Sequence, residues 1–198
     1  MRKTTLATTL LLGLCASYQA PAQQVQVTLD PGQTRIEWTL TATLHTVHGT
    51  FKLRSGVVTF DPNTGNASGE LVVDAGSGDS GNTSRDGKMN KEVLESKRYP
   101  EITFVPKKVT GNLAAQGNST VQVQGTLHLH GADHDLALSV PVQIVGSTVK
   151  AATNFVVPYQ SWGMKNPSVM LLHVDDKVQI NISAVGNLTR AGAAQGGH

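Results

Sequence analysis

Residues 135–144 read DLALSVPVQI, with an apolar side chain at every second position. Successive side chains of a β-strand point to opposite faces, so this alternation predicts a strand with one apolar face and one polar face. Such strands are typical of antiparallel sheets that have one face in water, because the strands of buried parallel sheets are apolar on both faces. The apolar row consists of Leu136, Leu138, Val140, Val142 and Ile144.

The same alternation recurs along most of the chain. Turn sequences such as Asp30-Pro31-Gly32 and Gly146-Ser147 separate the apolar rows, and Gly and Pro provide the backbone angles that reverse a chain. About eight strands at this spacing predict a β-sandwich or a β-barrel. The other predicted strands lie at Val25–Leu29, Ile36–Leu40, Val57–Phe60, Leu71–Val73, Ile102–Val105, Val121–Leu129, Val149–Val157 and Val178–Ala184.

One segment departs from this pattern. Residues 76–88 are polar and rich in glycine, which predicts a loop that buries no face, and residues 89–98 then carry apolar side chains at helical spacing before Pro100. We therefore expect a loop and one short helix inserted between two strands. Asp86 is the expected cap of this helix. Arg85 either pairs with a nearby carboxylate or holds an anionic head group, since helix N-termini and guanidinium groups both favour phosphate.

The N-terminal region has the organisation of a signal peptide. A positively charged start precedes the apolar stretch Leu6–Ala16, which is shorter than the roughly 20 residues that span a bilayer. Ala20-Pro21-Ala22 has the small residues that a signal peptidase recognises, so we expect cleavage before Gln23. Residues 1–22 are the predicted signal peptide, and we expect a periplasmic or secreted protein with no integral membrane span. A retained membrane anchor is the alternative.

The expected mature chain is electrically neutral. The sequence has 16 Lys+Arg and 14 Asp+Glu, and Arg2 and Lys3 leave with the signal peptide. A neutral chain has no long-range field that attracts nucleic acid or an anionic membrane, so neither is an expected partner. Cys15, the only cysteine, also leaves unless the protein is a lipoprotein anchored there. The remaining length suits one domain over residues 23–188, followed by a disordered tail at 189–198.

The sequence contains none of the common catalytic motifs. G-x-S-x-G, HExxH and Walker A patterns are not found. His128 and His130 share one strand face and could chelate a metal, but Leu127 and Leu129 occupy the opposite, apolar face. The two histidines therefore most simply belong to the solvated side of the sheet. We predict no catalytic residues, no metal site and no cofactor.

Several short motifs, taken in order, resemble the YceI-like family of exported, lipocalin-like proteins. The resemblance spans roughly residues 25–188 and implies an eight-stranded antiparallel barrel, with a helix after its fourth strand and a polyisoprenoid chain bound inside. The chain departs from the family after Asp86, where His and aromatic residues are common and Gly87-Lys88-Met89-Asn90 stand here. That departure bears on head-group recognition more than on the barrel. The motifs are Leu44-His45-Thr46-Val47-His48-Gly49-Thr50-Phe51, Gly81-Asn82-x-x-Arg85-Asp86, Tyr99-Pro100-Glu101-Ile102-Thr103-Phe104, Gly125-Thr126-Leu127-x-x-x-Gly131 and Trp162-Gly163-Met164.

We therefore expect an all-β, eight-stranded antiparallel lipocalin-like barrel that carries an isoprenoid-like or other long-chain apolar lipid in its interior. Trp162 and Met164 are expected at the barrel mouth, and His45, His48 and Arg85 near a head group. Two alternatives remain, namely a small exported enzyme that uses the same three polar residues and a stress-related structural protein with a solid core. A homodimer is left open. The expected apolar lining is Trp38, Leu40, Phe51, Leu127, Leu138, Phe155 and Ile180.

Overall fold

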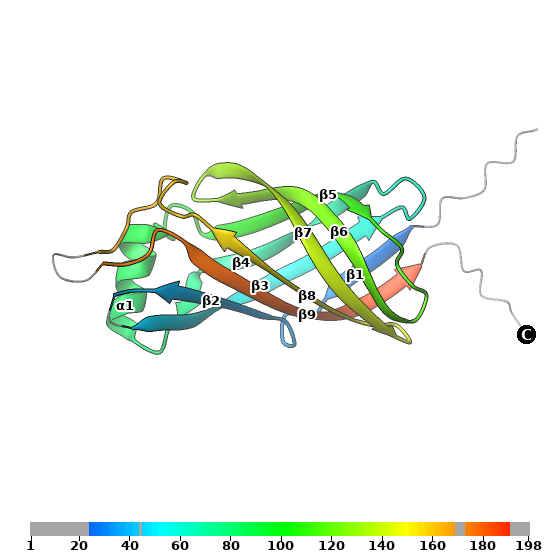
Figure 1. Cartoon of the computed structure of the whole chain (residues 1–198), viewed down its shortest axis with the longest axis horizontal. Helices are drawn as coiled ribbons and strands as arrows, with labels where there is room; N and C mark the ends of the chain where they lie inside the picture. Colours follow the sequence, from blue (N-terminus) through cyan, green and yellow to red (C-terminus); the bar gives the residue numbers. More distant parts are fainter. Residues whose placement is uncertain (1–23, 44, 169–172, 191–198) are drawn as a thin grey trace, which may run out of the picture.

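The computed structural model describes residues 24–43, 45–168 and 173–190, which form one closed antiparallel β-barrel (Figure 1). Each strand pairs with the next in sequence from β2 to β9, and β9 returns to β1 and β2. The predicted all-β fold class is confirmed. The strands of the described residues are β1 (Val25–Leu29), β2 (Arg35–Thr41), β3 (Thr46–Phe60), β4 (Ala67–Asp79), β5 (Glu101–Thr110), β6 (Gly117–Leu129), β7 (Ala132–Val145), β8 (Thr148–Val157) and β9 (Val178–Arg190).

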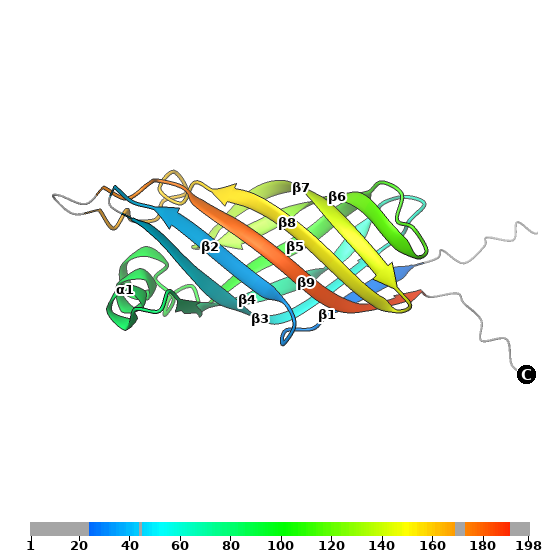
Figure 2. The ribbon, with the colours of Figure 1, turned by 60° about the horizontal axis from the view of Figure 1, so that its bottom comes forward.

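The strands β1 and β2 share one position in the barrel wall. Both run antiparallel to β3 and β9: β1 pairs with one half of each neighbour and β2 with the other half (Figure 2). The turn at Asp30 separates them, and the Asp30 carboxylate accepts a hydrogen bond from the backbone N–H of Gly32 at 2.8 Å. Nine strands in the described residues thus fill eight positions, which confirms the predicted eight-stranded barrel.

The predicted loop and helix after β4 are shifted in the structure. β4 continues to Asp79, so residues 76–79 are strand, and the glycine at 78 is needed because Phe51 and Met89 pack where its Cβ would lie. Helix α1 (Thr83–Lys88) begins earlier than expected and passes into a short π-helical segment, η1 (Met89–Val93). Asn82, not Asp86, caps α1, since its side-chain oxygen accepts a hydrogen bond from the N–H of Arg85 at 3.0 Å.

Two groups of buried side chains lie at opposite ends of the barrel. The terminal cluster lies where β1 begins and β9 ends, and it is dominated by valine. The second group, the α1-end cluster, lies near the helix. The terminal cluster is Val25, Phe60, Val109, Val121, Val142, Ile144, Val149 and Leu188. The α1-end cluster is Leu127, Leu129, Val157, Tyr159 and Met164.

The ends of the chain are only partly described. The predicted signal peptide, residues 1–22, lies outside the described residues. A disordered tail is predicted from residue 189. However, β9 continues through Thr189 and Arg190, which pair with Gln26 and Val25 of β1. Its remaining residues, 191–198, lie outside the described part. None of the helices in the described residues is long and apolar enough to span a bilayer.

Candidate ligand-binding cavity

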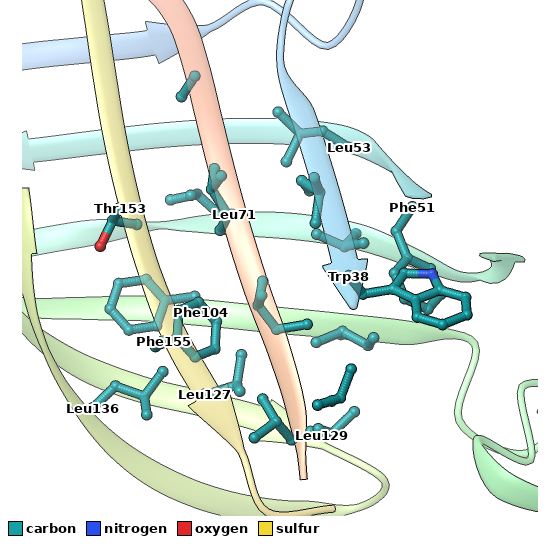
Figure 3. A pocket seen from close by; sticks show the side chains of 18 of the residues that line it. Trp38, Phe51, Leu53, Leu71, Phe104, Leu127, Leu129, Leu136, Thr153 and Phe155 are labelled. Atoms are coloured by element: carbon teal, nitrogen blue, oxygen red, sulfur yellow. The ribbon is translucent and has the colours of Figure 1, made fainter. Parts of the chain in front are cut away.

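The barrel encloses a cavity of about 720 Å³, walled by the inward-facing rows of the strands (Figure 3). This cavity favours a ligand-binding interior over the solid-core alternative. The inward rows line a space because the strands stand around a common axis, and several of their large side chains lie along the wall. All seven residues of the expected apolar lining face this cavity, namely Trp38, Leu40, Phe51, Leu127, Leu138, Phe155 and Ile180.

Glycines give the aromatic side chains room against the wall. A Cβ at Gly49 would overlap the indole of Trp38, its cross-strand partner on β2. A Cβ at Gly125 would lie 2.6 Å from the ring of Phe104. The rings can therefore approach the backbone of the neighbouring strand closely. Phe104 was not among the expected lining residues, although its alternation with Ile102 in the predicted strand 102–105 was a usable signal.

The only charged side chains among the described lining residues lie on α1. Arg85 and Lys88 line the cavity there, together with Asn82 and Ser84, and His45 lines it from the β2–β3 connection. Within the described residues, none of the lining side chains is Asp or Glu, and neither α1 cation forms an ion pair. The cavity is thus apolar along its length and positively charged at the α1 end.

Arg85 is held in place by Ser80, the residue that directly follows β4. Its Nε donates to the Ser80 hydroxyl at 2.7 Å, and its Nη2 donates to the Ser80 carbonyl at 2.9 Å. Ser80 in turn donates to the Asp86 carboxylate through its backbone N–H, at 3.0 Å, and through its hydroxyl. Arg85 therefore does not pair with a carboxylate directly, and the geometry fixes its guanidinium beside the cavity with further N–H groups unused.

Two residues that were expected at the site, His48 and Trp162, do not line the cavity, although Trp162 packs against the α1-end cluster. His48 follows Val47, whose side chain faces the cavity, so His48 points to the outer face, where its Nδ1 lies 3.0 Å from the hydroxyl of Thr39. Trp162 does not line the cavity but stacks on His134, with ring centroids 3.7 Å apart and planes at 7°. Strand alternation explains His48, whereas the position of Trp162 depends on a loop whose path the sequence pattern does not specify.

The segment after β8 closes part of the α1 end. Tyr159 and Met164 are buried and line the cavity. The Tyr159 hydroxyl donates to the Asp175 carbonyl at 2.6 Å. Burial, with smaller contributions from the charges of Asp175 and Asp176, raises the pKa of Tyr159 to about 12. The phenol therefore remains protonated at any ordinary pH and can keep this segment attached to the chain before β9.

Of the two histidines expected on the solvated side, His128 lies there and His130 does not. His128 is exposed and lies 2.7 Å from Asp133, as a solvated residue should. His130 is largely buried instead: its backbone adopts a φ of 54°, and its Nε2 lies 3.0 Å from the Glu95 carboxylate. Burial lowers the pKa of His134, which stacks on Trp162. Among the described residues, no group of three or more His, Cys, Asp or Glu side chains could hold a metal ion.

An eight-position barrel with an apolar cavity has the architecture of barrels that hold one small ligand. The chain belongs to the family of the YceI-like domain, whose family model matches residues 27–186. This confirms the resemblance that the sequence motifs indicated. A comparison with the curated proteins finds no match.

Solved structures with this fold come from several bacteria. BcnA of Burkholderia cenocepacia is 21% identical, with a TM-score of 0.65, covering 79% of this chain and 98% of its own. A domain of Saccharophagus degradans is described as polyisoprenoid-binding and implicated in plant cell wall breakdown. It is 17% identical with a TM-score of 0.65, and the match covers 82% of this chain and 98% of that domain. The YceI protein of Campylobacter jejuni is 16% identical with a TM-score of 0.54, and the match covers 94% of this chain and 98% of that protein. At these identities the likeness establishes the shared barrel.

Proposed function

We propose that this protein binds one long-chain apolar lipid inside the barrel, with the tail along the cavity and the head at the α1 end. The observation that carries the proposal is the cavity of about 720 Å³, apolar along its walls and cationic only beside α1. The Saccharophagus degradans domain described as polyisoprenoid-binding shares this fold, which favours an isoprenoid-like chain. We further propose that the protein acts as a carrier in the periplasm and not as an enzyme.

Burial of the tail supplies the binding free energy. Each buried methylene contributes roughly 0.8 kcal/mol. Ten such groups would offset the several kcal/mol that association costs in lost motional freedom, without any ionic contact. The apolar lining therefore provides affinity, while specificity depends on the few polar groups at one end.

The head of the ligand is proposed to lie near Arg85, Lys88 and His45. Because Ser80 already orients the Arg85 guanidinium, little side-chain entropy is lost when an acceptor oxygen binds it. His48 is left out of this proposal because it faces away from the cavity. The enzymatic alternative is thus reduced to His45 and Arg85, and none of the described lining side chains is an Asp or Glu that would orient His45 as a general base.

Native mass spectrometry of the purified protein tests the proposal directly. We expect a species heavier than the protein by the mass of one lipid, and solvent extraction should release that lipid. Protein that carries no added mass, and that gains none after incubation with all-trans-retinol as a C20 isoprenoid probe, would contradict the proposal.

A single substitution separates ligand binding from folding. In Leu138→Gln an amide enters the apolar wall, and a buried amide without a partner costs roughly 1–3 kcal/mol. We expect the variant to lose bound lipid, whereas the urea midpoint of lipid-free protein should change little, because water in the empty cavity can solvate the amide. Ser139→Gln, on the outer face next to it, is the matched control and should keep the lipid.

A further inference from the structure

The wall of the barrel is incompletely paired between β7 and β8. Only Val142–Val145 pair with Thr148–Ala151, next to the hairpin that joins the two strands. Yet β7 begins at Ala132 and β8 extends to Val157, and their other edges pair fully with β6 and β9. In Figure 1 the two strands separate from their hairpin toward the end that carries α1. Over that length the backbone edges of β7 and β8 face each other without ladder hydrogen bonds.

Pro141 accounts for the position at which the pairing stops. The Ser139 carbonyl accepts a hydrogen bond from the Thr153 hydroxyl of β8 at 3.1 Å, so the polar backbone groups of Ser139 face β8. Alternate residues of a strand present these groups to the same side, and Pro141 therefore also faces β8. Proline has no N–H to donate, so the ladder loses a donor just beyond Val142. The Thr153 hydroxyl takes the place of a backbone donor at Ser139.

The lining of the cavity departs from strict alternation at this seam. Ala151, Ala152 and Thr153 all line the cavity, although consecutive side chains of a complete wall point to opposite sides. Ala151 and Ala152 also line a shallow depression on the outer face of the barrel, together with Pro141. The small side chains of Ala151 and Ala152 thus border both the cavity and the outer depression, at the point where the paired part of the seam ends.

We propose that the seam between β7 and β8 is a lateral portal through which the apolar tail of the ligand passes. This inference rests on the proposed function. At most other seams of the barrel, longer hydrogen-bonded ladders would have to break before a chain could pass. Here β7 and β8 can separate further with little loss of backbone hydrogen bonding, and a passing chain meets apolar side chains such as Leu138 and Phe155. A tail could thus slide in sideways while its head remains outside.

A reversible cross-link tests the portal. If the ladder were extended, Ser139 would lie opposite Asn154, and both are exposed on the outer face. In a Cys15→Ser background we would join S139C to N154C by oxidation and follow the uptake of all-trans-retinol by stopped-flow fluorescence. We expect uptake to slow by about tenfold or more, equivalent to about 1.4 kcal/mol in the barrier, and to recover on reduction. Equilibrium affinity should stay the same.

The matched control joins Asn154 to its partner in the continuous wall. N154C/N181C bridges the β8–β9 ladder, and its uptake rate should not depend on oxidation. If oxidised S139C/N154C binds retinol as fast as the reduced form, the portal is wrong and the chain enters elsewhere, at the α1 end or at the equally short β4–β5 ladder. If the unmodified protein binds no retinol, the proposed function fails, and the portal fails with it. This outcome differs from failure of the portal alone, in which the protein still binds retinol but oxidation does not slow uptake.

A second variant restores the missing donor without a cross-link. Pro141→Val supplies an N–H toward β8, and we expect slow hydrogen exchange at this new amide and slower exchange at Asn154, together with slower retinol uptake. Gln143→Val, two residues along the same edge but within the paired part, is the control and should change neither. Slow exchange at residue 141 and at Asn154 with an unchanged uptake rate would overturn the portal.

Discussion

The two ends of the barrel use the same strand pattern for different purposes. At the terminal end, Ile144 is only 1% exposed and, like Val25, does not line the cavity, although the other six residues of the terminal cluster do. The cavity therefore narrows toward packed side chains at this end. At the α1 end, larger residues such as Trp38 and Phe104 leave the centre open, because glycines on the neighbouring strands let their rings lie close to the wall. The difference teaches that side-chain volume alone does not decide whether a barrel is filled; the direction of the side chain matters as much.

The largest expected effect lies at the terminal end. Ile144→Ala should lower the free energy of unfolding by about 2–5 kcal/mol, because it opens a new void in a packed cluster. Leu136→Ala, on the same strand but facing the existing cavity, should cost less than about 1.5 kcal/mol. Urea unfolding of lipid-free protein measures both. Equal costs for the two substitutions would mean that the ends are packed alike.

A smaller effect is expected where an aromatic ring lies close to the wall. Gly49→Ala should cost about 1–3 kcal/mol, since its Cβ would overlap the Trp38 ring and push it into the cavity. Lower affinity for retinol should accompany this loss of stability.

Gly87→Ala is the control, because nothing lies within 4 Å of its Cβ position and the residue is in α1. It should be neutral or stabilising by about 0.5–1 kcal/mol. Unchanged stability and retinol affinity in Gly49→Ala would show that the ring can move without cost.

The smallest effect is expected at the segment that closes the α1 end. The raised pKa of Tyr159, about 12, means that the folded protein holds the phenolic proton more tightly than the unfolded chain. Its contribution to stability is therefore complete below about pH 10 and is lost as the pH rises toward 12. Tyr159→Phe should cost about 1 kcal/mol at pH 8, by loss of the hydrogen bond to the Asp175 carbonyl.

Urea midpoints of the two proteins at pH 8 and pH 11.5 provide the measurement for Tyr159. The gap between them should narrow at the higher pH, since only the wild type loses this contribution. A gap that stays constant would show that the phenol does not titrate in this range.

Most of the wall could be predicted from the sequence, and most of the site's polar end could not. Alternation placed Leu138 and Phe155 correctly on the inner face, because the side-chain direction in a strand follows from position alone. The same rule assigns His48 to the outer face beside Val47, but the histidine was grouped with His45 by residue type. The error at Trp162 is different, since no periodicity governs the loop in which it stacks on His134.

The sequence by itself determined which segments are strands and which face of each is apolar, since both follow from a two-residue period and from the turn residues between the rows. Only the tertiary structure decided that the inner rows enclose a cavity, that α1 places Arg85 and Lys88 beside it, and that β7 is unpaired with β8 from Ala132 to Pro141. These features depend on distances between residues far apart in the chain. Local pattern carries no information about such distances until the barrel closes.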